Sequence, residues 1–351
     1  MPRRRPPIRA NALANGIRRH QINVFRFAQH LNGDVQKRLL GVRLELVRLV
    51  AAADPTEPTR LGDRLNRVEA VAAEAKKASA RAYREMRAQT NTEVVDWAAD
   101  EQRYFAQLAT RTSGVPALRT VPGRVLERIV DRALIQGSPA SEWWARQSEG
   151  LAQRFKDEVR LGTQAGESIG DIIRRVRGTG PAYADGILRA SQHHAEALVR
   201  SSVLSALHDT RMEEFRQNAD VIEGWAVLAT FDDRTCEQCM AFSGATYGLD
   251  GEPLPGSPVQ ERLPSDGLPL HMSCRCVASP VLVGEAPPAD LNFETWLREQ
   301  PEAEQQDILG PQWWTAWQSG ELTSLRDRID QRGRPLSLKA WRGQRGEREA
   351  A

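Results

Sequence analysis

Long apolar runs are missing from this 351-residue chain. No window approaches the roughly 18 consecutive apolar residues that a membrane-spanning helix needs. No apolar segment follows the N-terminal arginines, as it would in a secretory signal. We therefore expect a soluble protein that has no membrane partner and is not exported by the standard signal route. The sequence also lacks the G-x-S-x-G, H-E-x-x-H, P-loop and G-x-G-x-x-G patterns, so no familiar catalytic motif is present.

The sequence also has no large excess of one charge, because it contains 48 Lys and Arg residues and 46 Asp and Glu residues, for a net charge of +2. This balance gives no whole-chain argument for nucleic-acid binding. The first 20 residues differ, since no acidic residue precedes Asp34 and three prolines oppose a helix. We predict a basic flexible arm over residues 1–20, which is either a solvated tail or a contact for phosphate or an acidic protein surface. Its candidate contact residues are Arg3, Arg4, Arg5, Arg9, Arg18 and Arg19.

Helical periodicity dominates the first third of the chain. Apolar residues recur at spacings of three and four between Phe25 and Leu49, which predicts a helix with one buried face. The proline-containing stretch that begins at Asp54 ends this helix. An alanine-rich region with a similar apolar face follows over residues 60–112. We assign residues 21–130 to a helical hairpin region.

A second helical region is predicted over residues 131–220. Apolar spacing indicates helix from about residue 124 to 177 and again from about 188 to 219. Glycine disfavours helix interiors, so we expect interruptions in the first of these segments at Gly137, Gly162 and Gly166.

A small mixed module follows over residues 221–285. Apolar and β-branched residues from Ile222 to Phe231 predict a strand. Residues 243–270 contain five glycines and five prolines, which predicts a long loop. Residues 286–351 are expected to form short helices and a polar tail. The predicted fold is mainly α, with a long N-terminal helical region and a small C-terminal α+β domain stapled by a Cys/His cluster.

Cysteine is scarce, and all four cysteines lie within one short stretch. Cys236 and Cys239 form C-x-x-C, and His271, Cys274 and Cys276 form H-x-x-C-x-C, a donor set typical of structural zinc. Such a site takes four ligands, and we prefer Cys236, Cys239, His271 and Cys276, with Cys274 as the alternate. A zinc ion would close the long loop. Reduced unligated cysteines, disulfides or a redox C-x-x-C are the competing interpretations.

Two other functions use the same cluster. In one, the metal site is open and catalytic, and Asp232, Asp233 or Glu237 is the general base. Turn capping explains the two aspartates better, with Arg234 beside them as a local charge partner. In the other, a zinc-stabilised module binds DNA through Arg234, Arg275 and the N-terminal arm.

A zinc deaminase is a further enzyme candidate. His194 and Glu196 form H-x-E upstream of the C-x-x-C pair, which imitates the deaminase signature. Thr235 stands where that signature has proline, the H-x-E lies within a predicted helix, and His271 would have no role. We therefore do not favour this interpretation.

Several segments of the chain occur in a recognisable order: GESIGDIIRRVRG at 166–178, the helix at 196–225, TFDDRTCEQCMAFSG at 230–244, PLHMSCRCVASPV at 269–281, and LGPQWWTAWQSGEL with GRPLSL near the C-terminus. Together they resemble the Mu F-like minor head proteins of tailed bacteriophages, also called head morphogenesis proteins. One departure is Met272, which follows His271 where the family commonly has proline; it removes no metal donor. Residues 1–130 carry no matching motif.

The resemblance implies a structural or assembly protein, present in few copies, and no enzymatic reaction. It implies association with the portal protein and other capsid or scaffold proteins at the capsid interior, with a role in head assembly and DNA packaging or delivery. The basic arm would then contact portal or packaged DNA. The implied location is the virion head, and the host bacterial cytoplasm during assembly.

Overall fold

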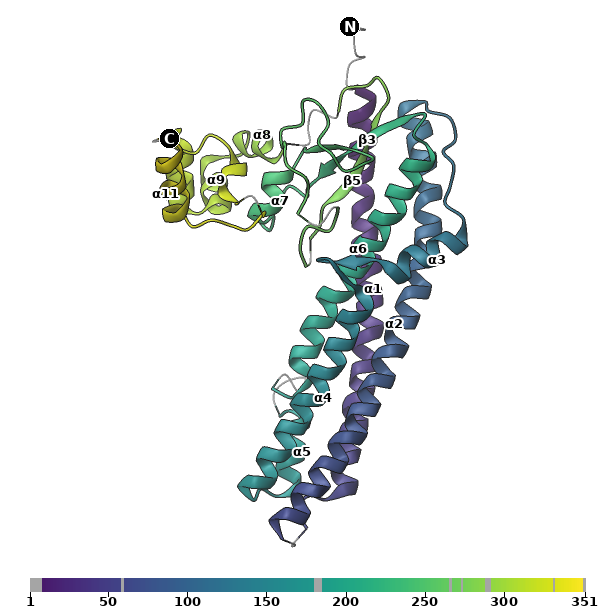
Figure 1. Cartoon of the computed structure of the whole chain (residues 1–351), viewed down its shortest axis with the longest axis vertical. Helices are drawn as coiled ribbons and strands as arrows, with labels where there is room; N and C mark the ends of the chain where they lie inside the picture. The colour runs from purple at the N-terminus through teal and green to yellow at the C-terminus, as the bar shows by residue number, and fades with distance from the viewer. Residues whose placement is uncertain are drawn as a thin grey trace. The chain divides into compact units, whose positions relative to one another are not determined.

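The computed structural model describes residues 8–57, 60–179, 185–264, 267–272, 274–287, 292–330 and 332–349, with the side chains of 8–10 and 346–349 excepted. The chain is mainly α with a small β component, which confirms the predicted fold class (Figure 1). No helix in these ranges has the length and apolar character needed to cross a membrane. The longer helices are α1 (Ile8–Ala53), α2 (Leu61–Ser113), α3 (Gly123–Arg132), α4 (Ala140–Ala165), α5 (Ile169–Arg177) and α6 (Leu188–Gln217).

Apart from α11, which has 12 residues, the other elements are short. The strands are β1 (Leu134–Ile135), β2 (Ser138–Pro139), β3 (Ile222–Leu228), β4 (Thr246–Gly248) and β5 (Val277–Leu282). The remaining helices are α7 (Glu237–Phe242), α8 (Phe293–Arg298), α9 (Glu302–Leu309), α10 (Pro311–Gln318), the 3₁₀ helix η3 (Leu325–Arg328) and α11 (Leu338–Glu349).

The start of α1 corrects the predicted flexible arm. The helix begins at Ile8, so most of residues 1–20 is helical. One face of the first turns of α1 is apolar and at most 4% exposed, and it carries Leu13, Ala14 and Ile17. These side chains pack in a core that includes Phe105 of α2. Burial of this apolar face stabilises the helix against the fraying expected of a terminus. Arg3, Arg4 and Arg5, and the side chain of Arg9, lie outside the described residues.

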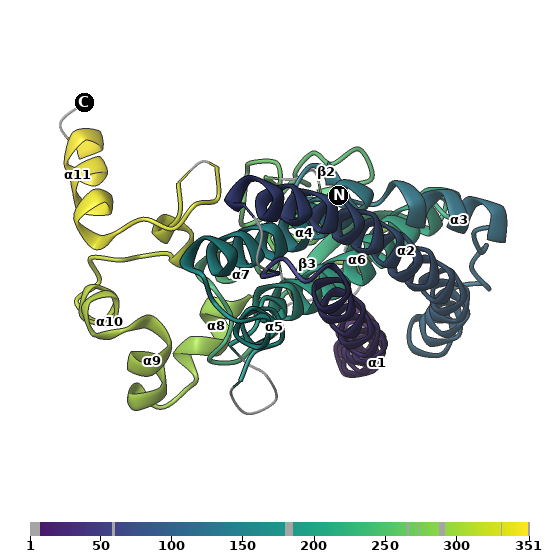
Figure 2. The ribbon, with the colours of Figure 1, turned by 90° about the horizontal axis from the view of Figure 1, so that it is seen from below.

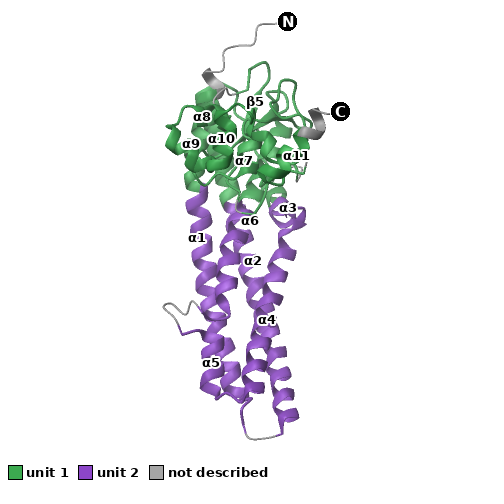
Figure 3. Ribbon diagram, turned by 90° about the vertical axis from the view of Figure 1, so that its left-hand side faces the viewer, with its two compact units in different colours: residues 1–23, 97–126, 204–351 green, residues 24–96, 127–203 purple. Residues whose placement is uncertain are grey.

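The chain divides into two compact units, each assembled from separate stretches (Figure 3). Unit 1 comprises residues 1–23, 97–126 and 204–351, and unit 2 comprises residues 24–96 and 127–203. The predicted blocks, by contrast, follow one another along the chain. The difference arises because α1, α2 and α6 are long enough to contribute residues to both units.

Unit 2 is a bundle whose helices lie side by side (Figure 3). Arg81 of α2 pairs with Glu45 of α1, and Lys156 of α4 pairs with Glu69 of α2, both at 2.7 Å. The buried aromatic contact between α2 and α4 is an edge-on arrangement of Tyr83 and Trp144.

Glycines in unit 2 do not all interrupt helices as predicted. Gly137 lies in the β1–β2 turn, and Gly166 ends α4 in the left-handed conformation with φ of 72°. Gly162, however, lies inside α4, where a Cβ atom would come within 2.6 Å of Ile172. Its role is close packing of α4 against α5, which outweighs the low helix propensity of glycine.

The sheet of unit 1 has the order β4-β3-β5, with β3 antiparallel to both neighbours. Trp225 in β3 lies opposite Tyr247 in β4 and Pro280 in β5. Proline is tolerated there because β5 is an edge strand in this sheet. The predicted strand is therefore present, and it ends at Leu228, before Phe231.

The C-terminal helices gather into one group within unit 1 (Figure 2). Their core contains Phe293, Leu297, Leu309, Trp317 and Trp341, all buried. The predicted helical C-terminal segment is thus organised around large apolar side chains.

Candidate metal centre

Pairing of β3 with β5 brings the two cysteine segments together. Leu228, at the end of β3, lies opposite Val277, at the start of β5. The C-x-x-C segment follows β3 along the chain, and the H-x-x-C-x-C segment directly precedes β5. Because the strands are antiparallel, the end of one meets the start of the other. Two segments more than 30 residues apart are therefore adjacent in space.

The C-x-x-C pair is positioned by the short helix α7. Cys236 is the residue before its first turn, in an extended conformation, and Cys239 lies three residues further along. This spacing places both thiols on the same side of one helical turn. Cys239 is 5% exposed, whereas Cys236 is half-buried.

His271 faces both thiols of this pair. Its Nε2 atom lies 3.0 Å from Cys236 Sγ and 3.2 Å from Cys239 Sγ. The Nδ1 atom lies 2.8 Å from the carbonyl oxygen of Met272, to which an Nδ1–H donates. With Nδ1 engaged in this way, Nε2 faces the sulfurs, and a metal-bound imidazole has the same ring orientation.

The remaining cysteines complete the cluster from the other side. Cys239 Sγ lies 3.8 Å from Cys274 Sγ, and the backbone N–H of Cys276 donates to Cys274 Sγ at 3.4 Å. Cys239 belongs to two groups of converging donors, one with Cys236 and His271 and one with Cys274 and Cys276. All four thiols are free, and Cys274 and Cys276 are at most 2% exposed. Every sequence-predicted ligand is therefore brought to one place.

The electrostatics divide the four thiols into two that favour the thiolate and two that do not. Hydrogen bonds from Cys239 and Cys276 lower the pKa of Cys274, whereas contact with Cys236 raises the pKa of Cys239. Cys239 acts to lower the pKa of Cys276, but contact with Cys274 and burial raise it. Contact with the Cys239 thiol, together with His271, lowers the pKa of Cys236 to about 4. Burial opposes the charged form of His271, yet the neighbouring thiolates raise its pKa to about 9. Thiolates and imidazole nitrogen are the donors that zinc takes in structural sites, so the residues fit this ion.

An ion pair that the sequence did not reveal joins the two segments. Arg275 donates to both carboxylate oxygens of Asp232 at 2.5 Å. Asp232 also accepts from the backbone N–H of Arg234 and the hydroxyl of Thr235. The predicted turn cap is present, but the charge partner is Arg275 rather than Arg234. The only sequence signal was alternation, which directs Arg275 away from the flanking cysteines.

The candidate general bases are mostly committed to other partners. Asp232 is held by Arg275, and Glu237 lies 3.2 Å from the buried guanidinium of Arg328. In the H-x-E pair, His194 contacts Gln147 and Glu196 pairs with Arg200. Within the described ranges, neither residue of that pair belongs to a group of converging metal donors.

The described arginines of the predicted arm differ in their surroundings. The guanidinium of Arg18 lies 4.5 Å from the centre of the Phe231 ring and also donates to Asn15. Arg19 is exposed. Arg18 therefore serves the packing of α1 in unit 1, while Arg19 is accessible.

The chain combines long helices with a small α+β module that carries a Cys/His centre. Residues 153–279 match the family described as Phage Mu protein F like protein. The match includes both cysteine segments, β3, β4 and the first residues of β5, and it confirms the resemblance stated above. This part of the chain, less than half of its length, is thus similar to the Mu F-like phage head morphogenesis proteins. No curated protein and no solved structure matches it significantly.

Proposed function

We propose that this chain is a minor head protein that associates with the portal and the capsid interior and supports head assembly and DNA packaging or delivery. Its location would be the virion head, and the host cytoplasm before assembly is complete. The Mu F-like match over residues 153–279, which encloses the whole Cys/His centre, carries this proposal. Long helices with exposed polar faces supply surfaces for protein partners.

The metal centre would act as a structural fastening. Cys236, Cys239 and His271 would supply three donors, and a buried cysteine of the C-x-C segment would supply the fourth. Bound zinc would tie the two ends of a long Gly- and Pro-rich loop together. Such binding energy is folding energy, because the unfolded chain has no preformed site. Four protein ligands leave no coordination position for a substrate.

Contacts around the fourth position support Cys274. Its sulfur lies 3.8 Å from Cys239 Sγ and accepts the N–H of Cys276, which leaves Cys276 as a supporting residue behind the site. The sequence analysis preferred Cys276 as the fourth ligand and gave Cys274 as the alternate, and this preference is still untested. We therefore propose Cys236, Cys239, His271 and Cys274 as the ligand set.

Metal analysis of variants tests the fastening. Full-length protein purified without added metal should contain about one zinc per chain, since a closed structural site retains its ion. Cys236→Ser should lose the zinc and melt at lower temperature. Cys274→Ser should behave in the same way, whereas Cys276→Ser should retain most of the zinc. A zinc-free, folded parent protein would refute the fastening, and zinc loss only in Cys276→Ser would reverse the ligand assignment.

Co-purification tests the assembly role. The chain would be expressed together with the portal protein of the same phage, and a stable complex is expected after affinity purification of either protein. A portal protein from an unrelated phage is the control. Equal recovery with both portals, or no complex with the neighbouring one, would contradict the proposed association.

The N-terminal arginines are proposed as a contact for packaged DNA. Deleting residues 1–7 removes Arg3, Arg4 and Arg5 but spares the buried Leu13 and Ile17. Each phosphate contact contributes about 0.9 to the slope of log affinity against log salt. The deletion should therefore weaken DNA binding and reduce that slope by about 2 to 3. An unchanged slope would remove the arm from the DNA-binding surface.

A further inference from the structure

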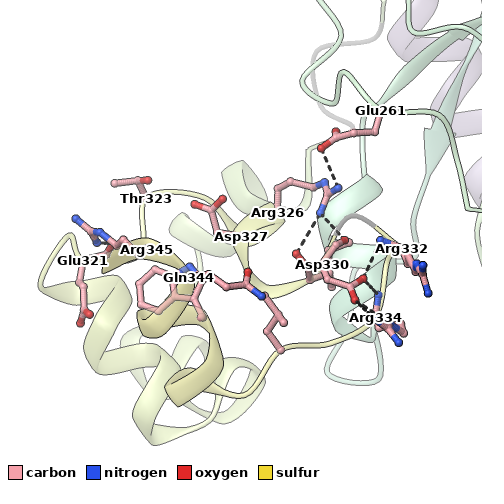
Figure 4. Close-up of a pocket in the computed structure, with 13 residues that line it drawn as sticks. Glu261, Glu321, Thr323, Arg326, Asp327, Asp330, Arg332, Arg334, Gln344 and Arg345 are labelled. Carbon is pink, nitrogen blue, oxygen red and sulfur yellow. Dashed lines mark hydrogen bonds and ion pairs between the residues drawn. The ribbon is translucent and has the colours of Figure 1, made fainter. Parts of the chain in front are cut away.

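A hollow of about 900 Å³ in unit 1 lies beside η3 and α11 (Figure 4). Its charged side chains largely satisfy one another. Arg326 donates to Glu261 at 3.1 Å, and Arg334 pairs with Asp330 at 2.7 Å (Figure 4). A wall of paired charges selects no particular class of ligand. A smaller cluster in unit 2 is more specific, because it combines metal-binding donors with a space the size of one ion.

This cluster comprises His30 and Asp34 of α1 and Glu93 of α2. His30 and Asp34 are four residues apart, so their side chains lie on one face of the helix, one turn apart. Nε2 of His30 lies 3.8 Å from Oδ2 of Asp34. Glu93 comes from the neighbouring helix of the bundle, and the three donor atoms all lie within 4.8 Å of one another (Figure 3). Donors from two long helices therefore converge.

The spacing of the three donors is close to that of ligands around a single ion. Two donors that each bind an ion at about 2.1 Å are at most about 4.2 Å apart. Small rotations of the side chains are enough to close the remaining gap. The side chain of His30 is 69% exposed and that of Asp34 is 28% exposed, so both can adjust and an ion can enter from solvent.

A cavity of about 10 Å³ adjoins the two carboxylates. It is lined by Asp34, Glu93 and Gln89, and by apolar side chains that include Leu31 and Met86. This volume holds about one water-sized sphere, so it admits a single ion or water and no organic ligand. Gln89 donates to Glu93 at 2.9 Å, while its own Oε1 is buried and has no hydrogen-bond partner among the described residues. A water bound to the ion would supply the missing donor.

The charges around the cluster leave room for a further cation. The carboxylates of Asp34 and Glu93 repel each other at this distance, and a cation between them relieves that repulsion. Lys37 donates to Oδ1 of Asp34 at 2.8 Å, from a side chain that is 77% exposed. Within the described ranges, no Lys or Arg forms an ion pair with Glu93. Lys37, and Arg38 at the edge of the cavity, compete with the ion and limit its affinity.

The donor types indicate the class of ion. Carboxylates bind Mg²⁺, Ca²⁺ and Mn²⁺, whereas an imidazole nitrogen favours first-row transition metals. One imidazole beside two carboxylates therefore favours an ion such as Mn²⁺ over Ca²⁺. The cluster contains no thiolate, which distinguishes it from the Cys/His centre and its preference for zinc.

We propose that His30, Asp34 and Glu93 bind a divalent first-row transition-metal ion that links α1 to α2 within unit 2. The site is separate from the Cys/His centre. Three protein donors leave the other coordination positions to water, so this ion exchanges with solvent and is lost during purification without added metal. When bound, it holds two helices together and stabilises the folded bundle.

Titration of the zinc-loaded, full-length protein with Mn²⁺ tests the proposal. Electron paramagnetic resonance measures the free Mn²⁺, whose signal is lost on binding. Mn²⁺ is a weak competitor for thiolates, so the zinc of the Cys/His centre stays in place. About one Mn²⁺ should bind per chain, and an excess of Ca²⁺ should displace little of it. No bound Mn²⁺, or equal displacement by Ca²⁺, would overturn the proposal.

Variants then locate the bound ion. His30→Ala and Glu93→Gln should each weaken Mn²⁺ binding by at least about tenfold, because loss even of a residue that only supports a ligand has an effect of that size. His193→Ala and Glu85→Gln change exposed residues of the same types elsewhere in unit 2 and should bind like the parent. Lys37→Gln should bind up to about fivefold more tightly, because a competing cation is removed. Parent-like binding by His30→Ala, or weaker binding by Lys37→Gln, would contradict the assignment.

Discussion

Asp232 shows how one side chain can organise a metal centre without donating to it. Its carboxylate holds Arg275, which lies between Cys274 and Cys276, and it also caps the turn before Cys236. One residue therefore sets the position of one cysteine segment against the other. Partners of this kind orient metal ligands and strengthen metal binding.

We predict that Asp232→Asn weakens zinc retention. The asparagine amide lacks the negative charge that pairs with both guanidinium nitrogens of Arg275. The two cysteine segments are then held less firmly in position relative to each other. Zinc affinity should fall by about 10- to 100-fold, the usual effect of removing such a partner. The measurement is competition with a chromogenic chelator. Asp233→Asn is the control beside it, and equal loss in both variants would show that Asp232 has no special role.

Glu214 is a buried carboxyl whose charge disfavours the folded state. Burial raises its pKa to about 8, although the nearby Arg211 opposes that change. One of its carboxyl oxygens is buried without a hydrogen-bond partner in the described part of the chain. The folded protein therefore keeps a proton on Glu214 at neutral pH.

This pKa predicts how stability changes with pH. An unfolded glutamate has a pKa of about 4.3, so between about pH 4.3 and 8 the folded state binds a proton that the unfolded state does not. The contribution of Glu214 to the free energy of unfolding therefore falls as pH rises through this window. Glu214→Gln should remove the fall and gain on the order of 3–5 kcal/mol over the parent near pH 8, at about 1.4 kcal/mol for each unit of pKa difference.

Urea unfolding at acidic, neutral and mildly alkaline pH measures this difference. Glu213→Gln, at a half-buried neighbouring position, is the matched control. Other buried groups also titrate: burial raises the pKa of Asp209 to about 7 and lowers the pKa of His208 to about 3. Because these groups titrate in both proteins, the difference between variant and parent cancels their contribution. A constant difference between Glu214→Gln and the parent across pH would contradict the prediction.

At the scale of elements, the first turns of α1 are part of the core of unit 1. The arginines in these turns and the prolines before Ile8 suggest a solvated arm, but the apolar residues of the turns form a buried face. Leu13 is fully buried, and a Cβ at Gly16 would come within 2.7 Å of Leu108 in α2. Close contact between α1 and α2 therefore extends almost to the beginning of α1.

We predict that Leu13→Ala destabilises the protein by about 2–5 kcal/mol, as for other buried leucines that leave a cavity. Ile22→Ala removes a side chain that is 54% exposed on the same helix. That control should cost less than about 0.5 kcal/mol. Chemical denaturation followed by circular dichroism measures both. A similar small effect for the two variants would mean that α1 is not anchored at this end.

At the scale of the whole molecule, the two units depend differently on the metal centre. All proposed ligands of the Cys/His centre lie in unit 1, and unit 2 is held by contacts between long helices. Metal binding stabilises the segments that carry its ligands, because closing the loop is costly without it.

We predict that a chelator acts locally. After zinc removal, hydrogen exchange should become faster in residues 236–282, around α7, the long loop and β5. Exchange in the parts of α2 and α4 that belong to unit 2 should stay within about twofold, since their apolar packing does not involve the ion. Cys236→Ser without chelator should reproduce the same map. Uniform acceleration over both units would show that the chain unfolds as one cooperative body.

Local sequence patterns were sufficient to predict the helical class, the positions of most helices and the candidate metal donors. These are local properties, because apolar spacing, proline and glycine positions and donor spacing act over a few residues. The ordered segments around the cysteines were also enough to indicate the Mu F-like resemblance.

The contacts between residues far apart in the chain become visible in the folded protein alone. The antiparallel pairing of β3 with β5 brings Cys239 to Cys274 and Arg275 to Asp232, and the packing of α1 against α2 buries Leu13. The same long helices build two units from separated stretches. These contacts depend on how faces pack across the fold, which local spacing does not encode.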